Sequence, residues 1–89
     1  HLYTSRYRIL IVNDIYDQQY NFYLEIFHAK QRTRAVPLHS LPDNSLVKLE
    51  HVVDNIKNQL HFTIKYREFE GMRWPEKQYL IQKYEKYRD

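Results

Sequence analysis

Cysteine is absent from the 89-residue sequence, and glycine occurs only once, at Gly71. Without cysteine, disulfides, thiolate zinc sites and cysteine nucleophiles are excluded. A single glycine excludes the loops that cradle phosphates in P-loop and dinucleotide-binding proteins, because such loops need glycine where backbone approaches ligand. No apolar run approaches the roughly 20 residues of a spanning helix, and no signal-peptide core is visible. We therefore expect an intracellular protein, cytoplasmic or nuclear, without a membrane partner.

Length and composition favour one small globular domain. The sequence is 43% hydrophobic and 28% charged, which is a globular rather than a disordered balance. A chain of this length buries about 60–65% of its unfolded surface, enough for one core and not for two. We expect a single domain over residues 1–89, and His1 in place of an initiator methionine fits excision from a longer chain.

Tyrosine is abundant, and the charge balance is mildly basic. Nine tyrosines occur, and 14 Lys and Arg residues against 11 Asp and Glu residues give a net charge of +3 at pH 7. Tyrosine joins an apolar ring to a polar tip, so it suits a core, a stacking surface or an interface.

Alternation of apolar and polar side chains predicts strands in three parts of the chain. In residues 6–12 and 20–27, apolar side chains stand at every second position and so share one face of a strand. An Asx-rich turn separates the two stretches. Residues 60–69 give the clearest pattern, with an apolar face and a polar face. This division is typical of an antiparallel sheet with one side in water.

Residues 14–31 also fit an amphipathic helix capped by Asn13, because their aromatic side chains recur every three or four residues. We favour a strand here, since aromatic and β-branched residues are frequent and alanine and leucine are scarce. A turn of similar sequence at 53–59 supports a second hairpin.

Residues 45–56 are equally ambiguous. Leu46, Leu49, Val53 and Ile56 fit helical spacing, whereas Val47, Leu49 and His51 alternate as in a strand. We favour a strand over 45–53, with 60–69 as its hairpin partner. Prolines at 37 and 42 mark residues 35–44 as an edge segment or a connection.

A helix is predicted over residues 75–88. Pro75 suits its first turn, and basic residues gather at its negative end. Leu80, Tyr84 and Tyr87 form its apolar stripe. The elements together predict an α+β, mainly β fold, with a small antiparallel sheet or partly open barrel of four or five strands closed by this C-terminal helix.

No pattern of catalytic or metal-binding residues emerges. The four internal histidines are scattered, and none has the spacing of a metal-ligand pair. Ser40, next to His39, lacks the strand–turn–helix context of a serine nucleophile. Glu68 and Glu70 could share a strand face, but an acid–base pair needs a pocket, and so short a chain has little room for one. We expect no enzyme activity, cofactor, metal or small-molecule substrate.

The strongest functional signal is the basic run at 30–34, where cations alternate and would share one strand face. Cations in the first strand alternate in the same way. If the two strands are neighbours, one surface for a phosphate backbone is formed by Arg6, Arg8, Lys30, Arg32 and Arg34. Tyr23 and Phe27 would stack on unpaired bases. We predict a small module that binds RNA or DNA, although an ordinary basic sheet edge gives the same pattern.

The alternative is a protein–protein interaction or assembly module that uses a sheet edge or the tyrosine-bearing C-terminal helix. Trp74 is the only tryptophan and is either a partner-binding anchor or a plug beneath the helix start. Tyr79 lies outside the stripe of Leu80 and is an interface candidate.

Overall fold

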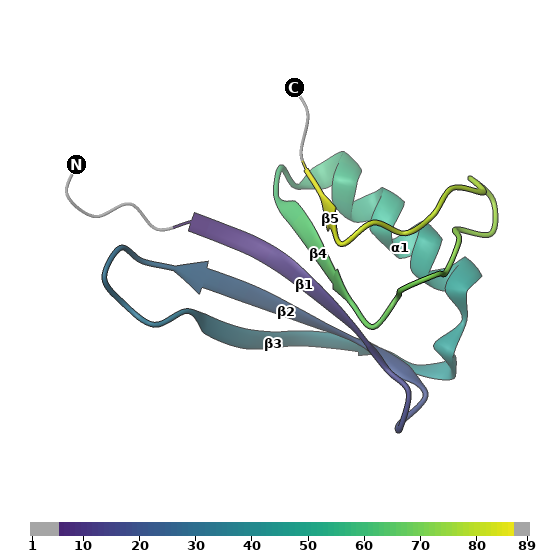
Figure 1. Ribbon diagram of the computed structural model, residues 1–89, viewed down its shortest axis with the longest axis horizontal. Coiled ribbons are helices and arrows are strands. Elements are labelled where there is room, and N and C mark those ends of the chain that lie inside the picture. The colour runs from purple at the N-terminus through teal and green to yellow at the C-terminus, as the bar shows by residue number, and fades with distance from the viewer. Residues whose placement is uncertain (1–5, 87–89) are drawn as a thin grey trace.

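The computed structural model describes residues 6–86, which form a five-stranded sheet and one α-helix (Figure 1). The elements are β1 (Arg6–Asp14), β2 (Gln19–Phe27), β3 (Arg34–Leu41), the 3-10 helix η1 (Pro42–Asn44), α1 (Leu46–Gln59), β4 (Thr63–Arg67) and β5 (Tyr84–Glu85). The strand order is β3-β2-β1-β4-β5, and β1 pairs antiparallel to β2 and parallel to β4. The α+β class is confirmed. The sheet has five strands, as the expected four or five allow. It is not closed, and it is mixed rather than antiparallel.

β1 and β2 form a regular hairpin, so the strand prediction for this region is confirmed and the rival helix over 14–31 is wrong. The register runs from Arg6 opposite Phe27 to Asp14 opposite Gln19. Asp14 stabilises the turn, because its Oδ1 accepts hydrogen bonds from the backbone N–H groups of Tyr16 and Asp17 at 3.2 and 3.1 Å.

Residues 46–59 form α1, so the strand predicted over 45–53 is wrong. The Ser45 hydroxyl caps the helix by accepting a hydrogen bond from the Lys48 backbone N–H at 3.3 Å. Leu49 and Val53 are buried against the sheet. The physical reason is topological: β4 runs parallel to β1, and a parallel pair needs a crossover instead of a hairpin turn.

The predicted C-terminal helix is also wrong. Residues 68–83 are turns and irregular chain, and β5 follows; Tyr87 and Arg88 lie outside the described residues. The Trp74 N–H donates to the Tyr79 carbonyl at 3.0 Å, and the Gln78 N–H donates to the Trp74 carbonyl at 2.8 Å. Gln78 has a left-handed φ of 71°, which ends a right-handed helix before it can propagate. The strand predicted over 60–69 shortens to β4 for a similar reason, since Glu68 has a φ of 68°.

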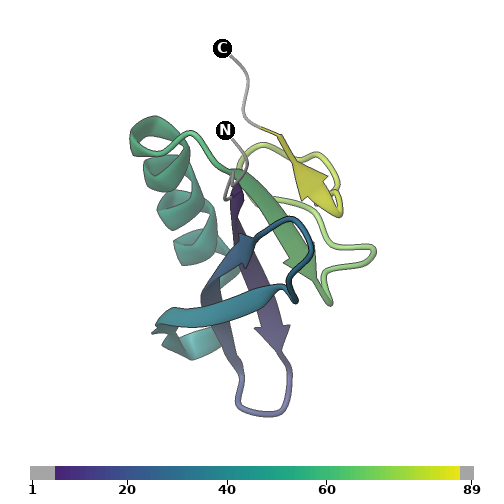
Figure 2. The same ribbon diagram turned by 90° about the vertical axis from the view of Figure 1, so that its left-hand side faces the viewer.

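The core lies between one face of the sheet and a layer made of α1 and residues 68–83, and α1 stands to one side of the sheet (Figure 2). Aromatic rings fill its centre: Tyr66 lies edge-on to Phe69 at 5.7 Å and to Trp74 at 5.6 Å between ring centres. The buried hydrophobic residues on the strands alternate with residues of the opposite face, such as Ile9 and Ile11 in β1. No helix among residues 6–86 has the length and apolar character to cross a membrane.

The turn at Asp14 generates a pH prediction. Hydrogen bonds from the backbone of Asp17, and then from Asn21 and Tyr16, hold the pKa of Asp14 below its ordinary value of 3.8, against a smaller opposing effect of burial. A depressed folded-state pKa adds stability above the unfolded pKa, and this stability is lost as the pH falls through the folded pKa. We expect Asp14→Ala to lower the free energy of unfolding at neutral pH, and the gap from the unmodified chain to close below pH 3.8.

Urea denaturation across this pH range measures the gap. The control is Glu70→Ala, which removes an exposed carboxylate outside the turn. A gap that stays constant with pH would contradict the assignment of the stabilisation to the ionised carboxylate.

Candidate functional site

The face of the sheet opposite α1 is named here the open face. Ile9 and Ile11 point into the core, so the alternate residues of β1 point the other way. The register places side chains from β2, β4 and β5 beside them. On β1, β2, β4 and β5 the open face consists of Arg6, Arg8, Leu10, Val12, Asp14, Gln19, Asn21, Tyr23, Glu25, Phe27, Thr63, Lys65, Arg67 and Tyr84.

Arg8 occupies the centre of the open face. Its Nε and Nη2 atoms both lie 2.8 Å from Oε1 of Glu25, which is 7% exposed. The guanidinium carbon lies 4.5 Å from the Phe27 ring centre and 5.4 Å from that of Tyr84. Cation–π attraction of this kind orients both rings. Because Glu25 neutralises it, Arg8 organises the face and contributes little free positive charge.

Lys65 and Arg67 extend the open face across β4. They stand opposite Leu10 and Val12 of β1, and the Lys65 ammonium lies 5.8 Å from the Tyr84 ring centre. Neither residue was predicted as a site residue. The signal was present in the sequence, because both belong to the polar face of the strand expected at 60–69 and alternate as Arg6 and Arg8 do.

The structure does not bring all five predicted cations onto one strand face. Lys30 and Arg32 lie in the connection between β2 and β3, where Lys30 has a φ of 67°. Arg34 pairs with Ile26 and so has the orientation of the core face, opposite to that of Arg6. Arg6 stands opposite Phe27, at the end of β2 from which this connection departs.

The predicted aromatic site residues are divided between the two faces. Tyr23 and Phe27 lie on the open face and are half-buried. Trp74 is only 3% exposed and packs against Tyr66, which is the position expected of a plug, the second of the two roles that the sequence left open. Tyr79 is 45% exposed, as an interface candidate must be.

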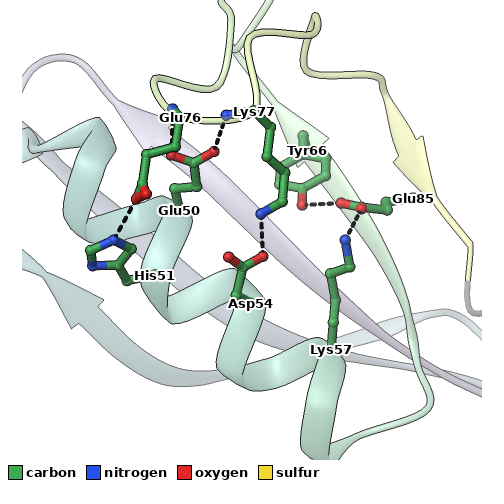
Figure 3. Close-up of polar contacts among 8 residues, drawn as sticks. All are labelled: Glu50, His51, Asp54, Lys57, Tyr66, Glu76, Lys77 and Glu85. Carbon is green, nitrogen blue, oxygen red and sulfur yellow. Dashed lines mark hydrogen bonds and ion pairs between the residues drawn. The ribbon is translucent and has the colours of Figure 1, made fainter.

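A group of polar contacts, named here the clasp, ties residues 76 and 77 to α1 (Figure 3). The Glu50 carboxylate is buried and accepts hydrogen bonds from the backbone N–H groups of Glu76 and Lys77 at 2.9 and 3.1 Å. Lys77 also forms an ion pair with Asp54. Burial alone would lower the pKa of Lys77, but the hydrogen bond and charge of Asp54 raise it. The clasp therefore supplies acceptors to a segment whose own strand pairing is limited, among the described residues, to the bridge between Arg73 and Leu80.

A second polar contact fixes β5. The Tyr66 hydroxyl donates to Oε1 of Glu85 at 2.7 Å, and Oε2 of Glu85 accepts from Lys57 of α1. Burial and the negative charge of Glu85 raise the pKa of Tyr66, so the hydroxyl stays a donor. β5, although short, is thus held to β4 and α1 together (Figure 3).

Lys57 and Glu85 of this second contact line a groove of about 800 Å³ beside the open face. It lies between the end of α1, the connection to β4 and the segment that leads into β5. Its lining residues are Lys57, Leu60, Phe62, Trp74, Tyr79, Gln82, Tyr84, Glu85 and Lys86. Tyr84 belongs both to the groove and to the open face.

Comparison with known proteins gives no match: no family model, curated protein or solved structure is similar to this chain. Among residues 6–86, no group of three or more His, Asp or Glu side chains is arranged to hold a metal ion.

The clasp generates a stability prediction. Glu50→Gln replaces a charged acceptor of two backbone N–H groups by a neutral one, so we expect it to lower the free energy of unfolding by about 1.5–3 kcal/mol. Urea denaturation monitored by Trp74 fluorescence measures the change. Glu70→Gln, on an exposed side chain, is the control. An equal change in the two variants would contradict a special role for Glu50.

Proposed function

We propose that this protein binds single-stranded nucleic acid on the open face. The observation that carries the proposal is the combination of cations and rings on a sheet face that α1 leaves uncovered. Arg6, Lys65 and Arg67 form no ion pair with an acid among the described residues. Arg6 stands opposite Phe27 and Lys65 opposite Tyr84, and Leu10 lies between Lys65 and Tyr23. Cations that track phosphates and rings that stack on bases are the recipe for sequence-tolerant single-strand binding.

Charge on the open face favours an anionic ligand. Glu25 is already neutralised by Arg8, which leaves Arg6, Lys65 and Arg67 to act on a phosphate backbone. Asp14 lies at the turn end of β1, where its oxygens accept hydrogen bonds from the turn and from Asn21. Exposed Lys30 and Arg32 provide further cations near the opposite end, where Arg6 lies.

The helix argues for a single strand over a duplex. Duplex DNA is commonly read by a basic helix in the major groove. The cations of α1 are instead paired with acids, Lys48 with Asp43 and Lys57 with Glu85. A sheet that displays rings needs bases free to stack, which a single strand provides.

Salt dependence tests the proposal. We expect fluorescence polarisation to show that labelled single-stranded oligonucleotides bind the protein at low salt. The affinity should fall steeply as the salt concentration rises. The double variant Lys65→Gln/Arg67→Gln removes two phosphate contacts, so the slope of log K against log salt should become shallower by about 1.4 for a single strand. Lys48→Gln/Arg73→Gln removes the same charge from the side of α1 and should leave the slope unchanged. Equal effects of the two double variants, or no binding at low salt, would overturn the proposal.

A second candidate function, assembly through a sheet edge, is favoured by the exposure of β3. This outermost strand is exposed from Arg34 to Ser40 and presents Val36 and Leu38 to solvent. Free edges pair with other strands, although Pro37 removes one donor. Under this alternative the chain self-associates without salt dependence. Light scattering after size exclusion checks it: a strict monomer at high concentration would contradict self-assembly through β3.

A further inference from the structure

We propose that the groove beside β5 is a nucleotide site that takes one base and phosphate of the bound strand. This inference rests on the proposed function and adds a second site, a partly open groove, to the open face. The groove volume of about 800 Å³ lies within the range of small-molecule sites. Of the residues that the structure describes, four aromatic ones from separate parts of the chain line it: Phe62, Trp74, Tyr79 and Tyr84.

The walls of the groove are held in place before any ligand arrives. The clasp fixes the segment that carries Trp74 and Tyr79, and the contacts of Glu85 fix the strand that carries Tyr84. Trp74 is 3% exposed, whereas Tyr79 and Tyr84 are 45% and 41% exposed. The tryptophan is therefore packed as part of the core, and the two tyrosines offer ring surface to a ligand. A preformed site avoids much of the entropic cost of ordering side chains on binding.

The charges around the groove select an anion. Among the described residues that line the groove, Glu85 is the only acid, and both of its carboxylate oxygens are engaged, by Tyr66 and by Lys57. Lys86 adds positive charge to the lining, and the ammonium groups of Lys65 and Lys83 each lie 5.8 Å from the Tyr84 ring centre. A ligand with a planar ring and a phosphate matches both the aromatic lining and the positive charge of the groove.

The polar lining suits the edge of a base. Gln82 is exposed within the lining, and its side-chain amide carries both donors and an acceptor. A nucleobase presents the same mixture on its edge, so one amide can pair with it. Ring stacking and an amide contact are the means by which proteins hold unpaired bases.

Continuity with the open face identifies the ligand as part of a longer strand. Tyr84 lines the groove and also lies 5.4 Å from the Arg8 guanidinium at the centre of the open face. β5 is the edge of the sheet on this side. A strand that crosses from β2 over β1 and β4 therefore reaches the groove at Tyr84.

The test uses the whole chain and the fluorescence of Trp74, its only tryptophan and a lining residue of the groove. The probes are adenosine monophosphate, uridine monophosphate, adenosine and ribose 5-phosphate. We expect saturable quenching by the two monophosphates, weaker binding of adenosine and no effect of ribose 5-phosphate. Saturation-transfer NMR on the same probes gives a second readout that does not depend on tryptophan.

Two variants examine the groove, and one serves as control. Tyr79→Leu removes a stacking ring and should weaken monophosphate binding roughly 5- to 150-fold. Gln82→Ala should reduce binding while leaving the rings in place. Tyr16→Leu removes a ring that is 91% exposed in the turn between β1 and β2, and it should change nothing.

The outcomes separate this inference from the proposed function. If both readouts detect no monophosphate, or if Tyr79→Leu binds it normally, the nucleotide site is overturned, even where oligonucleotides still bind the open face. If monophosphates bind in the groove and oligonucleotides do not bind at low salt, the proposed function fails and the groove stands as a nucleotide site alone.

Discussion

The parallel pairing of β1 with β4 is the constraint on which the rest of the structure depends. It requires the chain to cross from β3 to β4 outside the sheet, and α1 is that crossover. One helix covers one face only. Ile9, Ile11 and Ile64 are thereby buried, while the alternate residues of the same strands lie on a face that no helix or strand within residues 6–86 covers. The division into a core face and an open face follows directly from this topology.

Polar groups help to hold β5 and the segment before it in place, because β5 is short and that segment is irregular. The buried carboxylate of Glu50 and the paired carboxylate of Glu85 hold these parts against α1 and β4. Buried charges are costly unless they are fully hydrogen-bonded, and both carboxylates accept at least two hydrogen bonds. These contacts also shape the groove. The open face and the groove meet at Tyr84, so the two proposed contacts with nucleic acid belong to one surface.

Local pattern alone predicted the hairpin of β1 and β2, because its alternation and its Asp14 turn need no distant partner. It failed at residues 46–59, where Leu49 fits both a helix and a strand, and the parallel pairing of β4 decides between them. It also failed at 75–88. Pro75 and the spacing of Leu80 and Tyr84 satisfied the rules for a helix, but the turn at Gln78 and the burial of Trp74 and Ile81 outweigh local preference. Lys65 and Arg67 alternate as clearly as Arg6 and Arg8, but two cations give a weaker charge signal than the three within residues 30–34.

Nuclear magnetic resonance of the isotope-labelled chain tests the central claim most directly. A short single-stranded oligonucleotide, added at low salt, should shift the amide signals of β1 and β4 around Arg8, Lys65 and Arg67. The signals of the solvent-facing side of α1, such as those of Lys48 and Asn55, should stay in place. Shifts that spare β1 and β4 and gather on α1 or on β3 would contradict the account, as would the absence of any shift.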